Sequence, residues 1–241
     1  MDKGEIREEL ERIKGEVEVR GPLDPKFWSI VKEVKLQRIL VEEFASIIGE
    51  IDQLAFENKV RLKVDHRLGL VILIVWATIA VLPLLSYSGP SARTGILLIF
   101  TSIFLTTLLH DPAHYLVGRL MGIRFTYMFP DGPVKIEPSL KTDYATYLRI
   151  PPLKRMIFHF SGPLTTSFLV PIAFLTMAFI LDVPPFARYV LAGMLFMDIA
   201  SEFTPIVLTE YLKKSNLLGM NFRRADYARA LREWRIARTW T

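Results

Sequence analysis

The stretch LLHDPAHYLVGRLMGIR, residues 108–124, decides how the rest of the chain is interpreted. Two histidines, His110 and His114, and one carboxylate, Asp111, stand inside an otherwise apolar run. Residues four apart share one face of a helix, so both imidazoles can point at a single position with Asp111 beside them. The spacing therefore predicts a helix that binds a metal ion.

The composition indicates a membrane protein. Of 241 residues, 51% are hydrophobic, and the chain has no cysteine. A metal must therefore be held by histidine and carboxylate, because thiolate ligands are excluded. The net charge of +5 comes from Lys and Arg near the ends of apolar segments, where they suit lipid headgroups, and no basic stripe interleaved with aromatic residues is present. We expect a lipid bilayer and no nucleic acid as partner, and the pattern specifies no oligomeric state.

Four apolar segments are long enough to cross a bilayer as helices: residues 68–86, 94–120, 156–181 and 187–212. Basic residues concentrate before the first, between the second and third, and after the fourth. The positive-inside rule then places both termini and residues 121–155 in the cytoplasm. We expect a multi-pass protein of the cell membrane.

The predicted fold is an all-α integral membrane protein with about four transmembrane helices. Its three parts are a soluble N-terminal helical region at residues 1–66, a transmembrane core at 67–214 and a basic amphipathic C-terminal tail at 215–241. The soluble region is either a helical cap or a substrate-binding or regulatory part. The tail suits the surface of an anionic leaflet.

Short β-structure is also predicted outside the apolar segments. Residues 16–20 and 60–64 alternate in polarity and either form strands or belong to helices. In the central loop, the turn signal at residues 130–133 precedes the alternating segment 134–137, which predicts a short β-hairpin. An edge of that hairpin either holds an extended substrate or is a simple surface feature.

The histidines are expected inside the membrane near its cytoplasmic face. Counting from Arg119, His114 and His110 lie about 8 and 13 Å below the boundary. Charged groups at that depth cost about 2.5–3.5 kcal/mol each, so they normally face a cavity, a partner or an ion. Catalytic zinc uses three protein ligands and activates a water, and Asp111 would then be the general base. The alternative is that the histidines only hydrogen-bond between helices.

Two segments resemble the site-2 protease family of intramembrane zinc metalloproteases. HDPAHYLVGR at 110–119, followed by GIR at 122–124, is similar to the family's H-E-x-x-H-Y-x-V-A-R…G-I-R. PPLKR at 151–155 and SGPLTT at 161–166 resemble its P-P-x-K-R…A-G-P-L-A-N. The resemblance implies a zinc cofactor held by His110 and His114 and a membrane-anchored protein substrate cut near the cytoplasmic face.

The same resemblance implies further site residues, namely Gly162, Pro163 and Thr166 for substrate binding and Glu210 as third metal ligand. Glu210 falls where the family has the Asp of P-x-P-P-L-D-G, whereas Thr166 stands where it usually has Asn. His159, one turn before Gly162, lines the pocket or packs between helices.

Depth in the membrane leaves alternatives for the third ligand. Glu210 lies about 5 Å inside, and Glu202 and Asp198 about 16 and 22 Å inside. Glu210 and Glu202 fit the histidines comparably, and Asp198 fits less well. Because Asp111 replaces the family's Glu and the third-ligand motif is incomplete, a catalytically inactive membrane scaffold is the second hypothesis. A small transporter is the third.

Overall fold

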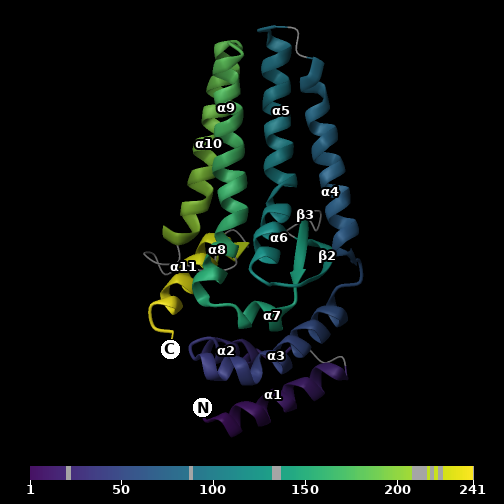
Figure 1. The fold of residues 1–241 in the computed structure, drawn as a ribbon, viewed down its shortest axis with the longest axis vertical. Coiled ribbons are helices and arrows are strands. Elements are labelled where there is room, and N and C mark those ends of the chain that lie inside the picture. The colour runs from purple at the N-terminus through teal and green to yellow at the C-terminus, as the bar shows by residue number, and fades with distance from the viewer. Residues whose placement is uncertain are drawn as a thin grey trace. The chain divides into compact units, whose positions relative to one another are not determined.

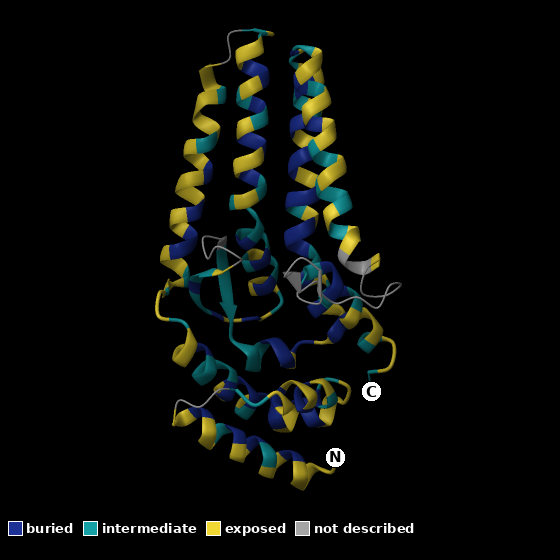
Figure 2. Ribbon diagram, turned by 180° about the vertical axis from the view of Figure 1, so that it is seen from behind, coloured by how far each residue is buried: buried dark blue, intermediate teal, exposed yellow. Residues whose placement is uncertain are grey.

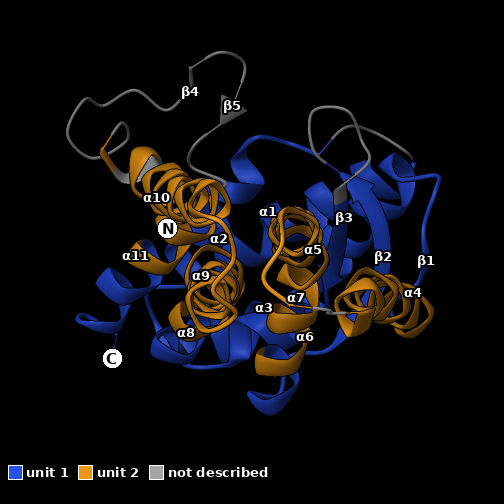
Figure 3. Ribbon diagram, turned by 90° about the horizontal axis from the view of Figure 1, so that it is seen from above, with its two compact units in different colours: residues 1–66, 118–155, 232–241 blue, residues 67–117, 156–231 orange. Residues whose placement is uncertain are grey.

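The computed structural model describes residues 1–19, 23–86, 89–131, 137–207, 216–217, 220–221 and 225–240. It is 78% helical and contains a small sheet of 3 strands, so the prediction of a mainly helical chain is confirmed (Figure 1). The residues group into two compact units (Figure 3). Unit 1 contains residues 1–66, 118–155 and 232–241, and unit 2 contains residues 67–117 and 156–231.

Unit 1 contains the amphipathic helices predicted for the N-terminal region. Its helices are α1 (Lys3–Glu18), α2 (Lys26–Val34), α3 (Arg38–Lys59) and α7 (Tyr144–Arg149). A capping box formed by Asp2 and Glu5 begins α1, and the apolar side chains that recur at helical spacing are fully buried: Ile6, Leu10, Ile13 and Val17. Residues 16–18 are therefore helical, which decides between the two alternatives left open for that segment.

The sheet of unit 1 has the strand order β1-β2-β3, with both neighbouring pairs antiparallel. Its strands are β1 (Val64–Asp65), β2 (Phe125–Asp131) and β3 (Glu137–Thr142). β2 and β3 form the predicted hairpin, with Met128 opposite Leu140. The expected alternating segment lies mostly outside the described residues. A separate pair of two-residue strands, β4 (Asn216–Leu217) and β5 (Met220–Asn221), lies in the C-terminal part.

Unit 2 contains long apolar helices, two short helical turns and the first part of a charged C-terminal helix. They are α4 (His66–Val81) with the short 3-10 turn η1 (Leu82–Ser86), α5 (Ala92–Leu108), α6 (His110–Leu120), α8 (Pro152–Pro163), the π-helical turn η2 (Leu164–Leu169), α9 (Val170–Ile180), α10 (Pro185–Ile206) and α11 (Asp226–Ala237). The chain passes from one unit to the other after the first residue of α4 and within α6, α8 and α11. Leu98, Phe174 and Leu191 are central members of the apolar core.

Two continuous helical segments are long and apolar enough to cross a membrane, His66–Ser86 with 21 residues and Pro152–Ile180 with 29. The bent pair of α5 and α6 makes a third if it is one span. Many large apolar side chains of these helices are exposed, among them Val71 and Trp76 of α4, at 56% and 57%. Figure 2 shows exposed positions recurring along the long helices. These helices indicate membrane association. Four spans are not shown within the described residues, since α10 is not among the candidate membrane-crossing helices there.

The second predicted span is broken immediately before the first histidine. Helix α5 ends at Leu108, α6 begins at His110, and the two axes differ by 43°. Pro112 explains the break, because it has no N–H to donate to the carbonyl of Leu108 and its ring crowds that turn. The break makes His110 and Asp111 the first residues of a new helix.

Candidate metal centre

Helix α6 places its two histidines against one another. The Nε2 atoms of His110 and His114 are 3.2 Å apart, and the ring centroids are 4.8 Å apart. His114 is 7% exposed and His110 is partly exposed. The four-residue spacing thus brings two imidazole nitrogens to one position, as the sequence predicts.

The third member of the group is Asp226, the first residue of α11. Its Oδ2 lies 3.2 Å from Nε2 of His110 and 3.2 Å from Nε2 of His114. Zinc bonds of about 2.0–2.1 Å at tetrahedral angles place neighbouring donor atoms about 3.3 Å apart. The three donor atoms therefore fit one face of a tetrahedral site, and this group can hold a metal ion.

Of the three carboxylates expected as third ligand, the two that the structure describes, Glu202 and Asp198, are not in this group. Glu210 lies outside the described residues. Glu202 accepts a hydrogen bond from Ser167 at 3.1 Å, and Oδ2 of Asp198 has no hydrogen-bond partner within the described parts of the chain. Neither Glu202 nor Asp198 joins the histidines in the metal-binding group found among these residues.

Sequence reasoning missed Asp226 because the pattern of arginines and apolar residues in the C-terminal tail predicts a basic amphipathic helix on a lipid surface and no metal ligand. Asp226 is 112 residues beyond His114, and no local spacing connects the two. The available signal was an acid at the start of an amphipathic helix, where a carboxylate normally only stabilises the helix. The contact between α11 and the histidines is visible only in three dimensions.

Hydrogen bonds on the outer side of each imidazole orient it toward the group. Nδ1 of His114 lies 2.8 Å from the carbonyl oxygen of Phe158, to which it donates. Nδ1 of His110 lies 3.2 Å from the hydroxyl of Thr166, and that hydroxyl donates to the carbonyl of Gly162 at 3.1 Å. We assign the proton of each ring to Nδ1 on this basis, which leaves both Nε2 lone pairs facing Asp226. The Nε2 lone pairs of both histidines and the carboxylate of Asp226 then face one another. A cation, or additional protons, must offset the repulsion between these electron-rich groups.

Gly162 provides the space in which the histidines meet. A Cβ atom at this residue would lie 2.4 Å from Nε2 of His114 and 2.8 Å from Nε2 of His110. Pro163 follows at the end of α8, and Thr166 lies in the π-helical turn η2. Single π-helical turns often occur at functional sites because they shift the side chains that follow. Gly162 and Thr166, expected at a substrate site, therefore contact the metal-binding histidines.

The second oxygen of Asp226 is also held in place. Oδ1 lies 3.5 Å from Nδ1 of His159 and 3.5 Å from Nη1 of Arg229. Burial raises the pKa of the Asp226 carboxyl, but the surrounding histidines outweigh burial and hold this pKa well below its ordinary value. This effect of the histidines requires protonated imidazoles and so applies to the metal-free group, and the ionised carboxylate is the form that binds a metal.

Asp111 is the remaining acid of the motif. Its side chain is 8% exposed, and its Oδ2 has no hydrogen-bond partner among the residues that the structure describes. A buried carboxylate oxygen without a partner is costly and calls for an explanation at a functional site. Its place in the first turn of α6, next to His110, makes it available to accept a proton.

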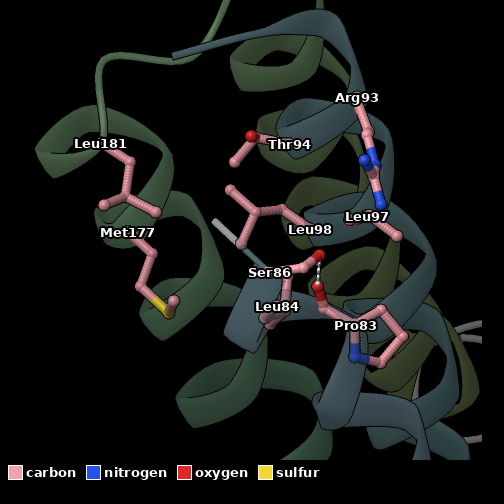
Figure 4. Close-up of a pocket in the computed structure, with 9 residues that line it drawn as sticks. All are labelled: Pro83, Leu84, Ser86, Arg93, Thr94, Leu97, Leu98, Met177 and Leu181. Atoms are coloured by element: carbon pink, nitrogen blue, oxygen red, sulfur yellow. Dashed lines mark hydrogen bonds between the residues drawn. The ribbon is translucent and has the colours of Figure 1, made fainter. Parts of the chain in front are cut away.

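A small cavity elsewhere in unit 2 offers no comparable chemistry. It encloses about 40 Å³ and is lined mostly by apolar side chains of η1, α5 and α9, as Figure 4 shows. The only hydrogen bond between its lining residues that the figure draws runs from Ser86 to the carbonyl of Pro83, at 2.7 Å. Arg93 is its single charged residue. The metal-binding group is therefore the candidate functional site.

Comparison of the chain with protein-family models, with curated proteins and with solved structures found no match. Its function is accordingly inferred from the geometry and chemistry of this site.

Proposed function

We propose that the protein is a zinc-dependent intramembrane endopeptidase that hydrolyses a peptide bond of a membrane-anchored protein near the cytoplasmic face. The observation that carries this proposal is the convergence of His110, His114 and Asp226 in a largely apolar helical chain, with Asp111 beside them. Two nitrogen ligands and one carboxylate leave a fourth position for water, which is the arrangement of catalytic rather than structural zinc sites.

The donor set favours zinc over the other common divalent ions. Imidazole nitrogen suits zinc, whereas calcium and magnesium prefer sites made of oxygen ligands. Bound zinc would lower the pKa of its water to about 7 and polarise a carbonyl oxygen. The hydrogen bonds that Nδ1 of His114 and Nδ1 of His110 donate to Phe158 and Thr166 would keep both imidazoles in the tautomer that such an ion requires.

The chain's own acid would move the protons of the reaction. Asp111 takes a proton from the attacking water and passes it to the amine that leaves, a role that typically contributes 10²–10⁴-fold in rate. Its carboxylate is buried and its Oδ2 unpartnered within the described residues, so no local hydrogen bond competes for the proton.

The proposed protein crosses the membrane four times, which adds two spans to the two candidate helices. The bent pair α5–α6 is one span and α10 is another, with both termini in the cytoplasm of a cell-membrane protein. A broken helix suits this site, because the backbone groups freed at Pro112 are satisfied only beside protein or a water-filled cavity.

One observation favours a second candidate, a metal-binding scaffold without hydrolysis. The Thr166 hydroxyl is committed to His110 and to the carbonyl of Gly162, so it has no proton left for a substrate carbonyl. Asp111 is also one methylene shorter than the Glu usual in zinc-binding helices of this spacing.

The experiment that separates the two candidates reconstitutes the zinc-loaded protein with extracted membrane proteins in vesicles and maps newly formed protein N-termini. The proposal predicts new N-termini within apolar segments for the wild type and none for Asp111→Asn or for His114→Ala. A wild-type protein that retains one zinc per chain yet produces the same N-termini as Asp111→Asn would establish the scaffold instead.

A further inference from the structure

The carboxylate of Asp226 presents its two oxygens to different neighbours within unit 2. Oδ2 lies 3.2 Å from Nε2 of His110 and 3.2 Å from Nε2 of His114. Oδ1 lies 3.5 Å from Nδ1 of His159 and 3.5 Å from Nη1 of Arg229. All five residues belong to unit 2. One oxygen therefore faces the metal-binding histidines, and the other faces a third histidine and a cation.

His159 approaches Asp226 from helix α8. It is 6% exposed, and its ring packs against that of Phe158, with centroids 5.1 Å apart. The carbonyl of Phe158 is also the group to which Nδ1 of His114 donates. Neighbouring residues of one helix thus orient a histidine ligand through its outer nitrogen and contact the third ligand through its outer oxygen.

The surroundings of Oδ1 are unfavourable for a metal ion. At 3.5 Å, the contact of His159 with Oδ1 is electrostatic rather than a fully formed hydrogen bond, and we assign a proton to Nδ1 because it faces a carboxylate oxygen. The guanidinium of Arg229 is always charged. A divalent cation shared between Oδ1 and Oδ2 would lie closer to both groups and be repelled by them, whereas a cation on the Oδ2 side avoids them.

The number of oxygens that Asp226 offers decides whether water can reach the metal. A carboxylate binds a metal ion through one oxygen or through both. Two histidine nitrogens and one oxygen leave the fourth position of a tetrahedral zinc site open, and a second oxygen would fill it. The fourth position is where the proposed hydrolysis needs its water.

We propose that His159 is a positioning residue that keeps the fourth position of the metal centre open. Together with Arg229, it holds Oδ1 of Asp226 turned away from His110 and His114, so that Asp226 ligates through Oδ2 alone. This inference rests on the proposed metal site and adds the feature that preserves its water position. Groups that hydrogen-bond to a ligating carboxylate commonly have such an orienting role.

The test titrates azide into the full-length protein, loaded in detergent with one Co²⁺ per chain. Azide binds at an open position of the metal and changes its visible spectrum, so the wild type should show a saturable change. In His159→Phe, Oδ1 is released and can turn toward the metal. The azide dissociation constant should then rise at least about tenfold, because azide competes with an intramolecular ligand. All samples contain the same amount of Co²⁺, so differences in metal affinity do not enter the comparison.

Two amide variants separate the contact with Oδ1 from the packing of His159. The amide nitrogen of asparagine takes the place of Nδ1 of a histidine, whereas that of glutamine takes the place of Nε2. His159→Asn should therefore bind azide nearly as the wild type does, and His159→Gln should resemble His159→Phe. Arg229→Met removes the cation at a side chain that is 42% exposed, and it should weaken azide binding in the same direction but by less.

Thr101→Val is the control for general destabilisation of unit 2. Thr101 is 3% exposed, and its hydroxyl on α5 donates to the carbonyl of Ala80 on α4 at 3.0 Å. The variant removes a buried hydrogen bond of the same unit while leaving the contacts of Asp226 in place. Its azide affinity should equal that of the wild type.

Equal azide affinity in the wild type and His159→Phe would overturn the inference and leave the proposed function intact. Equal losses in His159→Phe and His159→Asn, or in His159→Phe and Thr101→Val, would overturn it as well, as would a wild-type Co²⁺ spectrum that azide does not change. If His159→Phe does not retain Co²⁺, unaltered azide affinity in Arg229→Met overturns the inference. Failure of the wild type to bind zinc or Co²⁺ would overturn both the inference and the proposed function.

Discussion

Replacing Gly162 by alanine tests the geometry of the metal centre with a single methyl group. The added Cβ would lie 2.4 Å from Nε2 of His114 and 2.8 Å from both Cε1 and Nε2 of His110. Ordinary contacts between such atoms are about 3.5 Å, so His114 must retreat by about 1 Å. The helix backbone of α6 and the bond from Nδ1 to Phe158 oppose that movement.

The consequence for metal binding follows from bond lengths. Zinc–nitrogen bonds of about 2.0–2.1 Å tolerate deviations of roughly 0.2 Å, so a displacement of about 1 Å removes His114 as a ligand. Loss of only the outer hydrogen bond of a metal ligand lowers metal affinity by about 10–100-fold. Loss of the ligand itself costs more, so we expect Gly162→Ala to lower zinc affinity by at least about 100-fold. The assay is equilibrium competition with a chelating dye in detergent.

Two other glycines of unit 2 serve as controls. A Cβ on Gly95 would lie 2.7 Å from Cβ of Ala187, so Gly95→Ala disturbs helix packing of the same unit away from the metal. A Cβ on Gly193 meets nothing within 4 Å, so Gly193→Ala should be neutral. Wild-type zinc affinity in Gly162→Ala, or an equal loss in Gly95→Ala, would refute the reasoning.

Three further predictions concern two groups beside the metal centre, Asp111 and Thr166, and the buried carboxylate of Glu233. Asp111→Asn should reduce hydrolysis about 10²–10⁴-fold while zinc content stays at the wild-type level; full activity in this variant would remove Asp111 as the base. Thr166→Val should weaken zinc about 10–100-fold and Thr166→Ser should not, as measured by dye competition, because the hydroxyl orients His110. Burial raises the pKa of Glu233, but Lys35 and Arg155 outweigh burial and hold this pKa below its ordinary value of 4.5. The ionised carboxylate therefore stabilises the fold at pH values above 4.5. This stabilisation is lost as the pH falls through the pKa of the folded state. Burial lowers the pKa of Lys35 to about 8, so Lys35 stays protonated throughout this acidic window. Glu233→Gln should therefore flatten the acid limb of a plot of denaturation midpoint against pH, and an unchanged limb would contradict this.

The parts of the fold that follow from local sequence were predictable. Apolar side chains at helical spacing identified α1, and the spacing of His110 and His114 placed both imidazoles on one face, because helical periodicity is a property of neighbouring residues. The turn signal in the central loop likewise indicated the hairpin of β2 and β3. Pro112 indicated a missing backbone bond, which the structure resolves as a bend of 43°.

The parts that depend on distant segments were not predictable. Asp226 reaches the histidines from more than a hundred residues away, and its neighbours in sequence give no reason to prefer it over Glu202 or Asp198. The pairing of β1 with β2, rather than with residues 16–20, is also set by packing. The ion pair of Arg155 with Glu233 was not predictable either. Each charge, taken from its own sequence segment, is expected to face solvent, and only the folded structure brings the two together.

The central claim is that His110, His114 and Asp226 together bind one metal ion, and the zinc content of the purified protein tests it most directly. After equilibration with micromolar zinc and removal of free metal, the wild type should contain one zinc per chain by mass spectrometry. Asp226→Ala should contain almost none, and Glu202→Gln and Glu210→Ala should contain the wild-type amount. A wild type without zinc, or an Asp226→Ala protein that retains it while Glu210→Ala does not, would contradict the account.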